Sequence, residues 1–97
     1  MKVELRYFDD CPSWKVTDAH LQSLVAELRF HLSRRLVESP DEAESLEFRG
    51  SPSVIVDGHD PFAAGDEPVG LSCRIYQTSD GPGGSPTIDQ LRAVLTS

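Results

Sequence analysis

Cys11 is the residue of this 97-residue chain that is best placed for nucleophilic chemistry. It follows Asp9 and Asp10 at the end of a predicted strand and precedes Pro12, a residue that fits the first turn of a helix. Unpaired backbone N–H groups and the positive end of the helix dipole favour the thiolate form there, whereas the two aspartates oppose it. We therefore expect a reactive Cys11, and the alternative is a small, buried apolar residue.

Trp14 lies three residues after Cys11, on the same side of the predicted helix. Its ring covers the thiol, or forms a stacking wall for a substrate, or instead begins the apolar stripe of the helix. Leu21, Leu24 and Leu28 continue such a stripe at helical spacing, which slightly favours the packing role.

The histidines do not complete a catalytic or metal-binding set. His20 and His31 lie too many helical turns beyond Cys11 to act as its local base. His59 and Asp60 could supply half of a metal site, but no further ligand is spaced with them. We therefore expect no bound metal.

The composition limits the classes of function. Nine Lys and Arg against sixteen Asp and Glu give a formal charge of −7, which argues against nucleic acid and anionic membranes as partners. No apolar run approaches the roughly 18 residues of a membrane span, and residues 1–6 alternate instead of forming the apolar core of a secretory signal. Two cysteines are too few for a disulfide scaffold. We expect a cytoplasmic protein with a single small domain, residues 1–97.

Hydrophobic periodicity and turn residues predict a sequence of alternating strands and helices. Ser39 and Thr87 begin capping boxes, in which a Ser or Thr precedes a Glu or Gln by three residues. The segment 58–71 is expected to be a surface loop that Phe62 holds to the body. The expected elements are a strand over 3–8, a helix over 12–32, a strand over 34–39, a helix over 40–47, a strand over 53–57, a strand over 73–78, a turn over 79–86 and a helix over 88–95.

Two short motifs stand at junctions of these elements. They are Cys11-Pro12-Ser13-Trp14, before the first helix, and Phe48-Arg49-Gly50-Ser51-Pro52-Ser53, at the third strand. With them the chain resembles the thioredoxin superfamily, in particular glutaredoxin-sized members and small bacterial thioredoxin-like proteins with CPxW and FRGSPT-type motifs. The resemblance implies an α/β thioredoxin-like fold, βαβ then ββα, with helices packed on a four-stranded mixed sheet in the order 2-1-3-4. The third strand would be antiparallel to the first.

The same resemblance implies roles for the motif residues. Pro52 would be a cis proline lying beside Cys11, and the backbone of Ser51 would pair with an extended peptide or with glutathione. The implied site consists of Cys11 as the catalytic nucleophile and of Pro12, Ser13, Trp14, Ser51 and Pro52 as substrate-binding residues. The chain departs from dithiol glutaredoxins at Trp14, where those proteins have their second cysteine.

Cys73 begins the predicted strand 73–78, which in the resembling fold would return from the end of the sheet away from Cys11. The preceding strand would run away from Pro52 for roughly 13 Å, at about 3.3 Å per residue. A disulfide needs Cα atoms within about 7 Å of each other. We therefore expect Cys73 to be an internal strand residue that is not bonded to Cys11, unless the 58–71 loop folds over.

Together these features predict a monothiol redox protein of the thioredoxin or glutaredoxin type, a candidate thiol–disulfide oxidoreductase. Cys11 would form mixed disulfides with proteins or small molecules. An external low-molecular-weight thiol such as glutathione would release them, because Trp14 replaces a resolving cysteine. Two alternatives stay open: a binding module that keeps the fold without the chemistry, and handling of soft metals or organomercurials by the thiols.

Overall fold

The structure is a computed structural model, and it describes residues 1–63, 65 and 67–96. It is a mixed α/β fold with a small sheet and helices, as the sequence predicts. None of the described helices is long and apolar enough to cross a membrane. The elements are β1 (Lys2–Tyr7), α1 (Trp14–Leu28), β2 (His31–Leu36), α2 (Pro40–Ser45), β3 (Ser53–Val56), β4 (Tyr76–Thr78), β5 (Gly81–Gly83) and α3 (Ile88–Thr96).

Helix α1 is shorter than the sequence pattern indicates. It ends at Leu28 because Arg29 adopts the left-handed conformation, with a φ of 56°, and donates its N–H to the carbonyl of Val25. The chain then pairs with β1 from His31 onward. The prediction that the helix continues to Leu32 is therefore wrong, since that residue belongs to β2.

The main sheet has the strand order β2-β1-β3. β1 is parallel to β2, with Val3 opposite Leu32, and antiparallel to β3, with Val3 opposite Val56. The parallel pair is possible because α1 provides the crossover between the two strands. The order of these three strands and the antiparallel direction of the third agree with the prediction.

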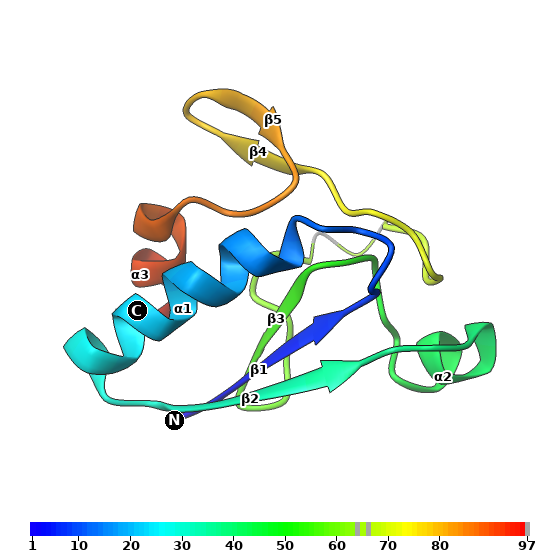
Figure 1. The fold of residues 1–97 in the computed structure, drawn as a ribbon, viewed down its shortest axis with the longest axis horizontal. Helices are drawn as coiled ribbons and strands as arrows, with labels where there is room; N and C mark the ends of the chain where they lie inside the picture. Colours follow the sequence, from blue (N-terminus) through cyan, green and yellow to red (C-terminus); the bar gives the residue numbers. More distant parts are fainter. Residues whose placement is uncertain (64, 66, 97) are drawn as a thin grey trace.

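The fourth strand of the predicted sheet does not join it. β4 pairs instead with β5 in a separate two-stranded sheet, where Tyr76 lies opposite Gly83. Gly81, with a φ of 98°, supplies the left-handed conformation at the turn between them. Figure 1 shows this hairpin standing away from the main sheet. The predicted four-stranded sheet is thus wrong for residues 73–78, and the predicted turn 79–86 contains a strand.

One apolar core lies between the main sheet and the two longer helices. β1 turns alternate residues, Val3 and Leu5, toward it, and each helix presents one apolar face. Because α1 and α3 both pack on this core and contact each other, they share one face of the sheet. The buried members are Val3, Leu5, Leu21, Leu24, Phe30, Val54, Val56, Leu91 and Leu95.

The capping box predicted at Thr87 is complete, whereas the one predicted at Ser39 is present in part, because the Glu42 carboxylate accepts the N–H of Glu38, one residue before the N-cap. Ser39 Oγ accepts the N–H of Glu42 at the start of α2. Thr87 and Gln90 exchange two hydrogen bonds, each backbone N–H donating to the other residue's side chain. α2 covers a second, smaller core, which consists of Val37, Ala43 and Phe48.

The 58–71 segment returns along the surface of the molecule, and its described residues are exposed or half-buried. Phe62 packs against the main core and sets its ring edge-on to Tyr76, with 5.3 Å between ring centroids. Asp60 and Glu67 form ion pairs with Arg74. Phe62 is therefore one attachment of the loop, as expected, and the ion pairs are a second that the sequence pattern did not indicate.

Candidate functional site

Cys11 and Cys73 are joined by a disulfide, with their Cα atoms 5.7 Å apart. The prediction that Cys73 lies at the far end of the sheet and is not bonded to Cys11 is therefore wrong. It assumed that residues 73–78 form a strand beside β3. The 58–71 loop instead carries the chain back to the end of the molecule where α1 begins, so that the two cysteines meet.

The segment 72–74 pairs with Ser51 through its backbone. The Ser51 N–H donates to the Ser72 carbonyl at 2.7 Å, and the Arg74 N–H donates to the Ser51 carbonyl at 2.9 Å. These bonds form a short parallel bridge between Ser51 and Cys73. The backbone of Ser51, which the resemblance assigns to a substrate peptide, is thus occupied by the chain's own residues. The same pairing diverts the chain from the edge of β3, which explains why β4 lies outside the main sheet.

Ser51 and Pro52 are buried, and the peptide bond between them is cis, as predicted. Ser51 Oγ donates to the carbonyl of Phe8 at 3.3 Å. The hydroxyl of Tyr76 donates to the carbonyl of Pro52 at 2.5 Å. Both residues therefore belong to the frame around the disulfide, and neither presents its side chain to solvent.

Cys11, Pro12 and Ser13 form the turn that leads into α1. The Cys11 N–H donates to the Phe8 carbonyl at 3.1 Å, and Ser13 is the N-cap residue but makes no side-chain cap bond. Gly84 packs on this turn so closely that a Cβ there would lie 2.3 Å from Ser13 Oγ. Cys11 is 2% exposed, whereas Pro12 is exposed.

Trp14 packs against Tyr7, with ring centroids 4.2 Å apart and planes inclined by 25°. It is half-buried and contacts the main core. Its indole N–H is buried and has no hydrogen-bond partner among the described residues. This placement supports the packing role of Trp14 over that of a free wall for a substrate.

Arg74, the neighbour of Cys73, is a residue of the site that the sequence reasoning missed. Its side chain is 4% exposed and forms ion pairs with Asp60 at 2.6 Å and with Glu67 at 3.8 Å. Burial opposes the charge of the guanidinium, but its bond to Asp60 and the surrounding groups raise the pKa of Arg74 on balance. The guanidinium also lies over the Tyr76 ring, 4.8 Å from its centroid. The sequence did carry a signal for the burial of Arg74. In extended chain every second side chain faces the same side, so a segment that buries Tyr76 also buries Arg74.

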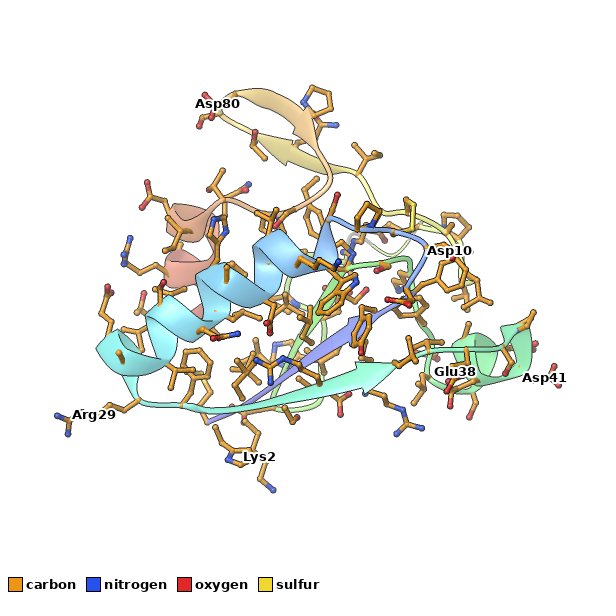
Figure 2. All side chains as sticks on the ribbon, viewed as in Figure 1. Lys2, Asp10, Arg29, Glu38, Asp41 and Asp80 are labelled. Atoms are coloured by element: carbon orange, nitrogen blue, oxygen red, sulfur yellow. A yellow bond between two sulfur atoms is a disulfide. The ribbon has the colours of Figure 1, made fainter. Side chains whose placement is uncertain are left out.

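Two exposed carboxylates stand next to the first cysteine of the disulfide. Asp9 and Asp10, both exposed, immediately precede the first cysteine. Figure 2 shows Asp10 and Glu38 toward one end of the molecule, and Lys2 and Arg29 toward the other. An anion approaching Cys11 therefore meets the carboxylates of Asp9 and Asp10.

In the described part of the chain, no three His, Cys, Asp or Glu side chains gather into a group that could hold a metal ion. Asp60, which the sequence analysis considered together with His59, is engaged by Arg74. The chemistry that this arrangement can perform is thiol–disulfide exchange at one pair of cysteines. No protein-family model, curated protein or solved structure matches this chain.

Proposed function

We propose that this protein is a thiol–disulfide redox protein whose working pair is Cys11 and Cys73. The observation that carries the proposal is the disulfide, which joins a cysteine before α1 to an exposed one 62 residues later in the chain. A thioredoxin-like fold is part of the proposal. The β2-β1-β3 order and the Cys11-Pro12 turn before α1 support it.

The reaction is a two-electron exchange between this pair and an external disulfide. In the dithiol form, one cysteine thiolate attacks a disulfide of a protein or small molecule, which leaves a mixed disulfide and releases one external thiol. The second cysteine then attacks the sulfur of the first and expels the other external thiol. An internal resolving cysteine is favoured over the external resolving thiol of a monothiol mechanism, because the two cysteines lie within bonding distance.

A cytoplasmic location is also part of this proposal. Cytosolic thiol pools keep most protein thiols reduced, and disulfides found there are usually transient and catalytic or redox-sensing. A cytoplasmic protein with this pair would therefore alternate between its two states. Its reductant would be glutathione, another low-molecular-weight thiol or a protein dithiol.

A binding module in which the disulfide is a permanent staple is the second candidate. Ser51 and Pro52 are buried rather than open to a substrate, which favours it. Closing a loop across a sequence separation of 62 stabilises a chain by about 4 kcal/mol in the chain-entropy description. That is a large part of the stability of a small domain.

Soft-metal binding by the reduced pair is a third candidate, favoured by the 5.7 Å between the two Cα atoms. The thiolates of two cysteines whose Cα atoms lie this close could bind one soft ion together. Titration of the reduced protein with Hg(II), in competition with a small dithiol, tests it. A complex that is lost in both single-cysteine variants is the result that this candidate requires.

The redox proposal is tested by equilibrating the protein in dithiothreitol buffers of graded potential. Thiols are then trapped by alkylation and counted by intact mass, while near-ultraviolet circular dichroism reports the fold. We expect both cysteines to change together and reversibly, with the fold retained in the dithiol form. Reduction that unfolds the protein would support the staple. The Cys73→Ser variant is the control for a monothiol mechanism, which predicts full turnover with glutathione in that variant.

A further inference from the structure

The two sulfurs of the disulfide belong to residues of very different accessibility. Cys11 is 2% exposed, whereas Cys73 is an exposed residue. Ser72, which precedes Cys73, is also exposed, and Ile75 is 63% exposed. A thiolate opens a disulfide by attacking one sulfur and displacing the other, and access is one of the factors that decide which sulfur is attacked. Of the two bonded residues, Cys73 is therefore the one that an external thiol can approach more easily.

The second factor is the stability of the thiolate that leaves. Cys11 stands at the N-terminal end of α1, a helix whose N-cap makes no side-chain bond and whose first turn carries no acidic residue. The helix dipole favours a negative charge on the Cys11 sulfur, and the carboxylates of Asp9 and Asp10 and the burial of Cys11 oppose it. In the described part of the chain no helix adjoins Cys73, which lies between the 58–71 loop and β4.

We propose, resting on the redox function above, that Cys73 is the sulfur that external thiols attack and that Cys11 is the leaving group. The external thiolate forms a bond to Cys73 Sγ, and the electron pair of the broken S–S bond leaves on Cys11 Sγ as a thiolate. A second external thiolate then attacks the external sulfur of the mixed disulfide. It releases the oxidised external disulfide and the Cys73 thiolate, so that two thiols supply the two electrons. This reverses the role expected for Cys11 from the sequence.

The pairing of residues 72–74 would hold the mixed disulfide in place. The bonds of Ser51 to Ser72 and Arg74 do not depend on the cysteine side chains, nor does the 3.0 Å bond from the Gly70 N–H to the Phe48 carbonyl. Cys73 therefore stays beside Cys11 after attack. In the opposite direction the Cys11 thiolate closes the disulfide again and expels the external thiol, which makes it the resolving cysteine.

The first experiment maps the position at which a thiol becomes attached. Oxidised protein is mixed with 2-mercaptoethanol for short times and quenched with acid, and the remaining thiols are alkylated. Trypsin separates the two cysteines, because Cys11 lies in the peptide 7–15 and Cys73 in the peptide 50–74. We expect the 2-mercaptoethanol adduct on the 50–74 peptide in about tenfold excess, in line with the control of exchange by access and leaving group.

The outcomes separate this inference from the redox function itself. An adduct mainly on the 7–15 peptide would overturn the assignment to Cys73 and leave the redox function standing. A folded protein that forms no adduct on either peptide and is never reduced would overturn both.

A second measurement compares two single-cysteine variants, Cys11→Ser and Cys73→Ser, in their reaction with the neutral reagent 4,4′-dithiodipyridine. Under native conditions the thiol of Cys73 is expected to react about tenfold faster than that of Cys11, because exposure controls access. In denaturant the two rates should become similar. Equal native rates in two folded variants would contradict the inference.

Discussion

Gly84 packs directly on Ser13, with no space between them for a side chain. A Cβ at Gly84 would lie 2.3 Å from Ser13 Oγ and 2.9 Å from Ser13 Cβ. Nearby, the hydroxyls of Ser85 and Thr17 are hydrogen-bonded at 2.6 Å. The segment after the β4–β5 hairpin therefore closes against the turn that carries Cys11.

Replacing Gly84 with Ala should open this contact. Ser13 Oγ can rotate away, but its Cβ cannot, so either the 84–86 segment or the start of α1 must move. We expect a loss of roughly 1–3 kcal/mol in the free energy of unfolding, the usual cost of overpacking, measured by chemical denaturation. Gly83→Ala is the matched control, because a Cβ there meets nothing closer than 3.8 Å. Equal stability of the two variants would show that the contact is not tight.

Asp10 should select among attacking thiols by their charge. The Asp10→Asn variant is expected to raise the ratio of the glutathione rate to the 2-mercaptoethanol rate by roughly two- to threefold at low salt, because a local negative charge repels the anionic thiol. The ratio isolates the charge of the attacking thiol, since any effect on the Cys11 thiolate changes both rates. Asp80→Asn, in the turn between β4 and β5, is the control and should leave the ratio unchanged. Added salt should shrink the difference in this ratio between Asp10→Asn and the native protein, and a difference that persists at high salt would argue against an electrostatic origin.

Breaking the buried ion pair of Arg74 and Asp60 should be costly. Their side chains are 4% and 12% exposed, so Arg74→Met leaves a carboxylate with little solvent to replace its partner. We expect a loss of about 3–5 kcal/mol in unfolding free energy, part of which Asp60→Asn should restore in the double variant. Arg34→Met removes a more exposed ion pair with Asp18 and should cost less than about 1 kcal/mol. If Arg74→Met and Arg34→Met lose similar unfolding free energy, the burial of the Arg74 ion pair does not add to its contribution.

Phe62 should control the susceptibility of the 58–71 loop to proteolysis. Its ring contacts Tyr76 and the main core, so Phe62→Ala removes an apolar attachment while the core residues of the sheet remain. We expect faster cleavage within the loop by a nonspecific protease such as subtilisin, with the overall fold retained by circular dichroism. Val69→Ala is the control, because Val69 is 43% exposed and gives up little buried area. Unchanged cleavage in Phe62→Ala would assign the attachment to the Arg74 ion pairs.

Tyr76 should make the folded state lose stability at high pH. Burial is the main cause that raises the pKa of its hydroxyl above the ordinary value of 10.0, although Arg74 acts in the opposite direction. Above pH 10 the unfolded chain therefore loses this proton before the folded protein does. The unfolding free energy then falls by up to about 1.4 kcal/mol per pH unit. Tyr76→Phe should be less stable at neutral pH, since the bond to the Pro52 carbonyl is lost, but its stability should depend less steeply on pH above 10. Parallel curves for the two proteins would contradict this.

Residues that are close in sequence determined much of the local structure. The alternation in β1, the Ser39 cap of α2, the capping box at Thr87 and the apolar stripe of α1 each depend on spacing within a few residues, and all are present. The position of Cys11 before a helix was readable for the same reason. The bounds of α1 and β2 were not, because the pairing of His31 and Leu32 with β1 overrides their fit to a helical pattern.

The partner of Cys11 was decided by the tertiary structure. Where Cys73 lies depends on the path of the 58–71 loop, and that path is held by contacts distant in sequence, between Arg74 and Asp60 and between Phe62 and Tyr76. The backbone of Ser51 forms hydrogen bonds with Ser72 and Arg74. The segment 72–74 therefore completes the site and does not extend the main sheet. A loop with several Gly and Pro residues is compatible with many paths, and only the sum of these long-range contacts selects one. The chain alone therefore indicated a thiol at a helix start, whereas the folded protein decided that this thiol is half of a disulfide.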